Sequence, residues 1–282
     1  LLRQLYSDTA MALENGLESI NREHREDDAK ALLLLGLSDW KSAAVETEMG
    51  RHYAPYWQGL STESHLAFAG LLRDLGEDEI RVALRPDPDR DATRACFAIV
   101  DHPGIFSRLA GALALVGANI VDARTYTSKD GFATAAFWIQ DADGKPYEAS
   151  KLPRMSKMID RILAGEVLPR EAFADRDKVK KRESAFRFPT HIMFDNEGSD
   201  IYTIIEVDTR DRPGLLFDLT RTLAGNNIYI ASAVIATFGA QVVDTFYVKD
   251  MFGLKLHAKS RQEALDKKLR QAILDGVKRA NL

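Results

Sequence analysis

The sequence predicts an α+β protein in which an all-helical segment precedes two copies of an antiparallel sheet with two helices on one face. Three observations predict this class. The spacing of apolar residues changes from helical to alternating near residue 76. The order strand, strand, helix, strand, strand, helix then occurs twice, and an Asp-x-Pro-Gly motif recurs 110 residues apart, at Asp101 and Asp211. With 282 residues the chain can bury more than one core.

Residues 1–76 have helical periodicity throughout. "STESHLAFAGLL" begins with Ser61, whose residue type suits a helix N-cap. Apolar residues at helical spacing form two further stripes, Leu2, Leu5, Thr9 and Leu13 in the first and Trp40, Ala44 and Val45 in the second. We therefore predict helices and no strand in this segment, which begins without Met and is expected to be a piece of a longer protein.

The first repeat is predicted over residues 77–165. It opens with "EIRVALR", where apolar residues alternate with charged ones as in a half-buried strand. A Lys-Asp-Gly turn joins its third and fourth strands as a hairpin. The expected elements are strands at 79–85 and 93–100, a helix at 105–116, strands at 118–128 and 131–141, and a helix at 150–163.

The second repeat is predicted over residues 189–282, after a charged linker at 166–188. Its expected strands are 190–194, 201–207, 229–237 and 242–250, and its expected helices are 215–223 and 260–274. The 110-residue offset pairs Ala123 with Ala233, and one residue is missing at the second hairpin turn. A repeat of this length indicates a duplicated domain.

Each repeat matches a ferredoxin-like unit with one difference. That fold normally ends in a strand beside its first strand, but neither repeat has a convincing strand after its second helix. The leading strands at 79–85 and 190–194 are free to take this position. We predict a permuted fold in which this hairpin closes the sheet.

The Asp-x-Pro-Gly motif has a structural and a functional interpretation. As a helix start, its Pro suits the first turn, its Asp accepts a backbone N–H, and its Gly lets the chain pass close to the sheet. As a site, the helix N-terminus offers amides to a carboxylate while Asp101 or Asp211 offers a partner to an ammonium group. Together these groups match an α-amino acid. Asn119 is expected beside the first motif, whereas Tyr229 stands at that place in the second, where Asn226 or Asn227 could compensate.

The strings "DHPGIFSRLAGALALVGANI" and "DRPGLLFDLTRTLAGNNIYI" resemble paired ACT domains, which bind amino acids. With "IASAVIATFGAQVVDTFYVKDMFGLKL" and "RHYAPYWQGLSTESHLAFAGLL", nearly the whole chain resembles the end of the HD domain and the two ACT domains of the bifunctional P-II uridylyltransferase/uridylyl-removing enzymes. The resemblance implies glutamine sensing, P-II as a partner of the parent enzyme, magnesium for that enzyme, and ACT-mediated self-association. The predicted ligand-binding residues are Asp101, His102, Gly104, Asn119, Asp211, Arg212, Gly214, Asn226 and Asn227.

Composition and motifs exclude several other functions. The net charge of -4 is spread over both signs, so neither nucleic acid nor a membrane is an expected partner. Cys96 is the only cysteine and suits a reducing cytoplasm. Six scattered histidines and the lack of phosphate-binding glycine loops leave no catalytic residue, metal site or cofactor predicted in this chain.

Two alternatives are considered. "KDGFATAAF" is similar to the third-strand motif of RNA-recognition domains, but Thr134 stands where a stacking aromatic residue is required. Phe132, Phe137 and Trp138 are better explained by sheet packing. The main alternative is an ACT pair that regulates another enzyme or binds amino acids as a separate module.

Overall fold

The computed structural model describes residues 22–141, 143–166, 189–212, 214–238 and 240–280. The predicted stripe at residues 2–13, nearly all of the predicted linker and Pro213 lie outside these residues. The first helices are α2 (Arg22–Gly36), α3 (Ser42–Arg51), α4 (Ala54–Gly59) and α5 (Thr62–Leu72). The later ones are α6 (Ile105–Leu115), α7 (Leu152–Leu163), α9 (Leu215–Ala224) and α10 (Lys259–Ala280), with short 3-10 turns at Pro88–Arg90 and Ala149–Lys151. None of the described helices is long and apolar enough to cross a membrane.

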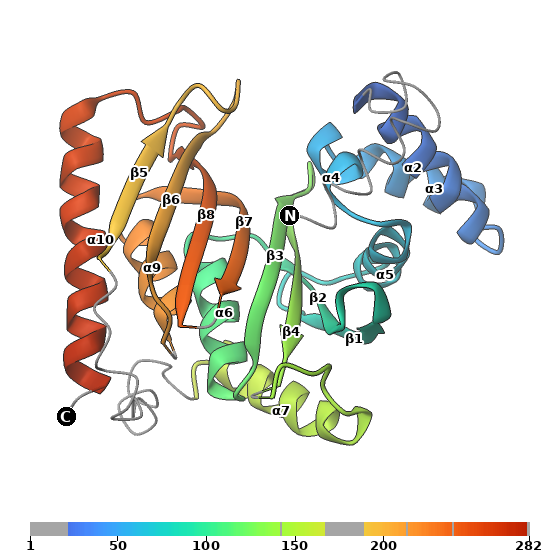
Figure 1. Ribbon diagram of the computed structural model, residues 1–282. Helices are drawn as coiled ribbons and strands as arrows, with labels where there is room; N and C mark the ends of the chain where they lie inside the picture. Colours follow the sequence, from blue (N-terminus) through green and yellow to red (C-terminus); the bar gives the residue numbers. More distant parts are fainter. Residues whose placement is uncertain (1–21, 142, 167–188, 213, 239, 281–282) are drawn as a thin grey trace, which may run out of the picture.

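All strands of the two repeats join one antiparallel sheet in the order β1-β2-β4-β3-β7-β8-β6-β5 (Figure 1). The first repeat contributes β1 (Arg81–Asp87), β2 (Ala92–Val100), β3 (Asn119–Thr127) and β4 (Phe132–Gln140). The second contributes β5 (His191–Asp195), β6 (Thr203–Arg210), β7 (Ile228–Phe238) and β8 (Gln241–Asp250). The predicted α+β class with two antiparallel repeats is therefore confirmed.

The permuted strand order is also confirmed. In each repeat the leading strand occupies the outer edge, because β1 pairs only with β2 and β5 only with β6 among the described strands. This is the position that a C-terminal strand holds in the usual ferredoxin-like order. A hairpin reaches it with a short connection, so no strand is needed after α7 or α10.

The repeats are joined at β3 and β7 by pairing of equivalent positions. Ala123 lies opposite Ala233, the residue 110 positions later, and Arg124 lies opposite Ser232. Pairing of equivalents requires a pseudo-two-fold axis at this point, as in an isologous dimer interface. The axis also brings α6 against α9 behind the sheet.

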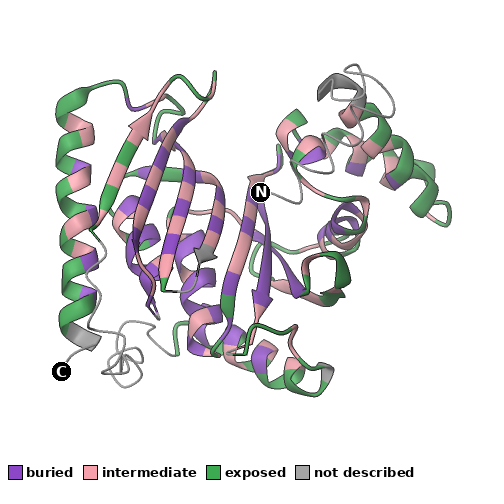
Figure 2. Cartoon of the chain, viewed as in Figure 1, coloured by how far each residue is buried: buried purple, intermediate pink, exposed green. Residues whose placement is uncertain are grey.

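The two repeats differ in what covers the front of the sheet. α6, α7, α9 and α10 lie on one face and enclose a core that spans both repeats. The other face of the first repeat packs against α2, α4 and α5, in a second core that includes Trp57, Phe68, Cys96 and Trp138. β2 is accordingly buried at every position except the last, while β6 alternates between buried and half-buried residues (Figure 2). The helical segment thus forms a third layer over the first repeat.

This second core explains residues that the sequence left ambiguous. Trp138 is 2% exposed in this core, and Phe137 is fully buried in the core on the other face of the sheet, so both residues have a packing role. Cys96 is also buried, and burial raises the pKa of its thiol to about 12. It packs as a small apolar side chain.

Candidate ligand site between the repeats

Both Asp-x-Pro-Gly motifs form the same turn before a helix. Gly104 has φ +87° and Gly214 φ +75°, left-handed values that glycine adopts without strain, and each is the N-cap of the following helix. The expectation that the Pro lies in the first helical turn is wrong for the first motif, because α6 begins at Ile105, after Gly104. The left-handed N-cap displaces Pro103 from the helix.

Asp101 does not cap α6, contrary to the prediction. No side-chain cap bond is made at this helix start. The Asp101 carboxylate oxygen Oδ2 instead accepts a hydrogen bond from Thr127 Oγ1 at 2.6 Å and another from the hydroxyl of Tyr229. Tyr229 comes from the second repeat, so this carboxylate lies on the junction of the two units.

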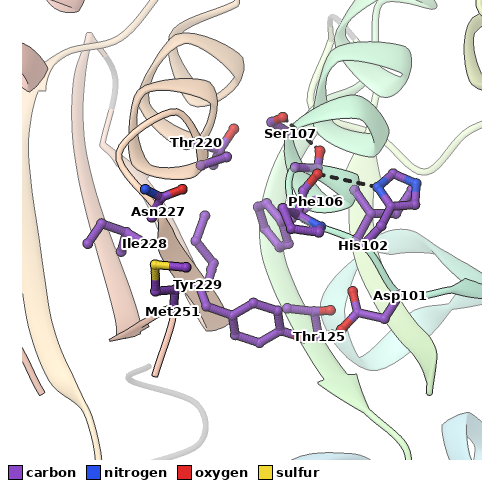
Figure 3. A pocket seen from close by; sticks show the side chains of 15 residues that line it. Asp101, His102, Phe106, Ser107, Thr125, Thr220, Asn227, Ile228, Tyr229 and Met251 are labelled. Carbon is purple, nitrogen blue, oxygen red and sulfur yellow. Dashed lines mark hydrogen bonds between the residues drawn. The ribbon is translucent and has the colours of Figure 1, made fainter. Parts of the chain in front are cut away.

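A cavity of about 140 Å³ opens beside this junction. Figure 3 shows His102 and Phe106 of the first repeat on one side, Asn227 and Met251 of the second on the other, and the Tyr229 ring reaching toward Asp101. The remaining lining residues are Pro103, Gly104, Ile105, Ser107, Thr125, Thr220, Ala224, Ile228 and Ile230. The volume is below the roughly 300–1,000 Å³ of sites for drug-sized ligands and suits a smaller molecule.

The structure brings some of the predicted site residues together and gives Asp101 a different partner from the predicted one. Asp101, His102, Gly104 and Asn227 all line the cavity, but Asn119 does not. Asn119 is exposed at the start of β3, opposite Gln140, whereas its equivalent Tyr229 contacts Asp101. The expectation that the first motif keeps Asn119 as its partner is therefore wrong. Asp101 contacts a strand of the other repeat, because β3 and β7 pair beside the pseudo-two-fold axis.

Asn226 and Asn227 have different surroundings. The Asn226 amide donates to the Thr222 carbonyl at 2.6 Å and accepts from Lys268, which ties it to α9 and α10. Asn227 has φ +58°, a left-handed conformation that Asn tolerates better than most residues, and its side chain lines the cavity. Only Asn227 is thus placed to contact a ligand there.

The second motif is enclosed more deeply than the first. Arg212 is 7% exposed, forms an ion pair with Asp218 at 2.5 Å, and packs against Gly276 of α10. The counterpart of Arg212 is His102, which is half-buried beside the cavity. Predicted residues Asp211, Arg212 and Gly214 are not among the residues lining the cavity.

A buried carboxyl group also distinguishes the second repeat. Asp244 of β8 is 1% exposed, and its Oδ1 atom has no hydrogen-bond partner in the described structure. Burial, followed by the charge of Asp211, raises its pKa well above the ordinary value. Burial also raises the pKa of Asp211. Ala135 occupies the equivalent place in the first repeat, so this acidic pair is a departure from the duplicated pattern.

Electrostatics keep the hydroxyl proton on Tyr229. Burial and then the negative charge of Asp101 raise the pKa of Tyr229. The tyrosine therefore donates to the carboxylate, which retains further lone pairs for a cation. The start of α6 supplies backbone N–H groups without intrahelical partners and the positive end of the helix dipole. The cavity combines an acceptor for an ammonium group with a helix start suited to a carboxylate.

Four features of the site were not predicted from the sequence: Thr127, Thr220, the contact of Tyr229 with Asp101, and Met251 in the lining. The relevant signal was present, since Tyr229 was recognised as the equivalent of Asn119. What was missing was the pairing of β3 with β7, which cannot be derived from the periodicity of either strand. Among the described residues no group of three or more His, Cys, Asp or Glu side chains could hold a metal ion.

Comparison with known proteins confirms the resemblance stated from the sequence. A family model described as the ACR9-like, ACT-like domain matches residues 191–280. The bifunctional uridylyltransferase/uridylyl-removing enzyme of Cereibacter sphaeroides is 72% identical over 280 residues, covering 99% of this chain and 30% of that protein. The enzyme of the same name from Ruegeria pomeroyi is 64% identical over 284 residues, covering 99% of this chain and 31% of that protein. The chain therefore spans about three tenths of the length of these curated relatives.

Among solved structures, aspartate kinase from Synechocystis aligns with 65% of this chain and 27% of its own, at 19% identity and a TM-score of 0.32. This likeness is too distant to bear on function.

Proposed function

We propose that this chain is the glutamine-sensing regulatory region of a bifunctional enzyme that attaches uridylyl groups to the P-II signalling protein and removes them. The names of the relatives and the ACT-like match support the class. The choice of glutamine as the ligand depends on the cavity that is lined by Asp101 of one repeat and by Asn227 and Tyr229 of the other. Uridylyl transfer and removal, with the magnesium they imply, are proposed to belong to the rest of such a protein.

In the proposed complex each polar end of glutamine has a matching group. The ammonium group binds the carboxylate of Asp101, and the α-carboxylate binds the backbone N–H groups at the start of α6. The side-chain amide pairs with Asn227, whose amide offers both a donor and an acceptor. The methylene groups lie against Phe106, Ile228 and Met251.

The lining also favours glutamine over glutamate. No Lys or Arg is among the residues that line the cavity, so a second carboxylate on the ligand would enter without a cation to pair with. Desolvating an unpaired charge costs more than desolvating an amide that keeps its hydrogen bonds. Binding then favours one arrangement of the regulatory region, and regulation follows from that difference in affinity.

Calorimetry of the 282-residue chain tests the proposal. Glutamine should bind and glutamate should bind at least about tenfold more weakly, the equivalent of roughly 1.4 kcal/mol. Asp101→Asn should weaken glutamine binding, whereas Asp143→Asn, in an exposed loop, is the matched control and should bind like the unaltered chain. No heat and no thermal shift with millimolar glutamine would refute the proposal, and equal effects of the two variants would refute the role of Asp101.

A further inference from the structure

The turn between β3 and β4, residues 128–131, links the cavity to the helical segment. On the cavity side the backbone N–H of Asp101 donates to the carbonyl of Gly131 at 2.9 Å. The Asp101 carboxylate also accepts a hydrogen bond from the hydroxyl of Thr127, the last residue of β3 before the turn. A ligand that moves Asp101 must therefore act on both ends of this turn.

Hydrogen bonds cross the turn, and others join it to the end of α3. Ser128 Oγ donates to Asp130 Oδ1 at 2.5 Å and accepts from the Phe132 N–H at 2.9 Å. The Lys129 N–H donates to the Arg51 carbonyl at 2.8 Å, and Lys129 Nζ donates to the Gly50 carbonyl at 2.9 Å. Backbone and side chain of one residue thus hold the same helix end.

An ion pair continues the connection into the helical segment. Arg51 Nε lies 3.0 Å from Asp130 Oδ2, and Arg51 Nη1 donates to Glu48 at 3.1 Å. Glu48 is 2% exposed and contacts His52 at 3.3 Å, and the His52 ring stacks on Tyr56 with centroids 3.6 Å apart. The side chains of Arg51, Glu48, His52 and Tyr56 are buried or nearly so, whereas the Asp130 side chain is 42% exposed. A displacement of Asp130 would therefore reach α3 and α4 through Arg51.

The second repeat shows that the fold itself does not require this connection. Its Asp211 N–H makes the same hydrogen bond to the Ala240 carbonyl at 2.9 Å, but its hairpin turn is one residue shorter. The sequence "FGA" there has no counterpart of the Lys129–Asp130 pair. Within the part of the chain that the structure describes, the second core contains sheet residues of the first repeat and none of the second. The extra residue in the first repeat lies where the helical segment is fastened.

From this difference we infer that the 128–131 turn couples occupancy of the cavity to the position of the helical segment, with Arg51 and Asp130 as positioning residues. The inference rests on the proposed function for the identity of the ligand. The resemblance implies that the helical segment is the end of an HD domain, so the turn is the proposed path by which a bound amino acid acts on that domain.

Hydrogen exchange of the 282-residue chain, with and without glutamine, tests the coupling. Glutamine should slow exchange of the amides at residues 48–60 about fivefold, the lower end of typical allosteric couplings. In Asp130→Asn the calorimetric affinity for glutamine should stay within about twofold while this protection is lost, because Asp130 is not among the residues that line the cavity. Glu166→Gln removes the exposed Arg161–Glu166 pair at 3.1 Å and is the matched control, with protection retained.

Two results would overturn the inference. One is binding of glutamine without any change at residues 48–60, and the other is full protection in Asp130→Asn. If glutamine fails to bind at all, the proposed function is refuted. The connection between the turn and the helical segment is then tested in the ligand-free chain. Thr127→Val should then speed exchange at residues 48–60 in the ligand-free chain, and unchanged exchange there would overturn the coupling by itself.

Discussion

His65 makes the helical segment sensitive to acid. It lies in α5 with no exposed surface, and its Nε2 atom donates to the Tyr56 carbonyl at 3.2 Å. Its Nδ1 atom is buried without a hydrogen-bond partner in the described structure. A second proton would therefore place a charge where no acceptor receives it, and burial lowers the pKa of His65 from 6.5 to about 4.

The difference between the pKa of His65 in the folded and in the unfolded chain makes the free energy of unfolding depend on pH. As the pH falls, the unfolded chain takes up the His65 proton near pH 6.5, whereas the folded chain takes it up only near pH 4. The contribution of neutral His65 to the free energy of unfolding is therefore complete above pH 6.5 and is lost as the pH falls toward 4. At 1.36 kcal/mol per pH unit, the full loss is about 3 kcal/mol, of which about 2 kcal/mol is reached at pH 5.

His65→Gln isolates this contribution, because glutamine can still donate to the Tyr56 carbonyl but does not titrate. Urea unfolding at pH 8 and pH 5, followed by tryptophan fluorescence, measures the change; Trp57 and Trp138 lie in the core that His65 shares, and Trp40 packs against it. The loss of stability between the two pH values should be smaller in the variant by about 2 kcal/mol. The exposed His257→Gln is the control and should match the unaltered chain. An unchanged pH dependence in His65→Gln would refute the reasoning.

Three further predictions concern the repeats. Asp244→Asn should raise stability at pH 8 and change it little at pH 4, because the raised pKa means that stability is lost as the pH rises from about 4; a variant equally stable or less stable at pH 8 in urea unfolding contradicts this. Gly104→Ala should cost about 1–2 kcal/mol in the same assay because φ is +87°, whereas Gly50→Ala, in α3 with open space around it, should cost nothing; equal effects would be contrary evidence. Tyr229→Phe removes the hydrogen bond between the repeats and should lower the free energy of unfolding by about 1 kcal/mol, so an unchanged urea midpoint argues against that bond.

The order of elements was predictable because each repeat obeys local rules. The alternation in "EIRVALR" predicted a half-buried strand, and the lack of a final strand predicted that it would close the sheet. The apolar run "ACFAIV" indicates burial on both faces, but nothing local says that the helical segment supplies the second cover. That contact depends on tertiary packing of residues such as Trp57 and Cys96, far apart in the sequence.

The site was predictable only in part for a similar reason. Asp101 and Gly104 follow from a turn motif within a few residues of each other. The partner of Asp101 depends on which strands meet between the repeats, and the pairing of Ala123 with Ala233 selects Tyr229 over Asn119. A long-range pairing thus changed the partner without changing the motif.

The central claim is that glutamine occupies the cavity between the repeats. Isotope-filtered NMR of the chain saturated with labelled glutamine locates the ligand directly. If glutamine occupies the cavity, nuclear Overhauser contacts are expected from the ligand methylenes to the rings of Phe106 and Tyr229 and to the Met251 methyl group. Contacts confined to residues around Asp211 and Leu215, or an absence of contacts to the cavity in a chain shown to bind glutamine, would contradict it.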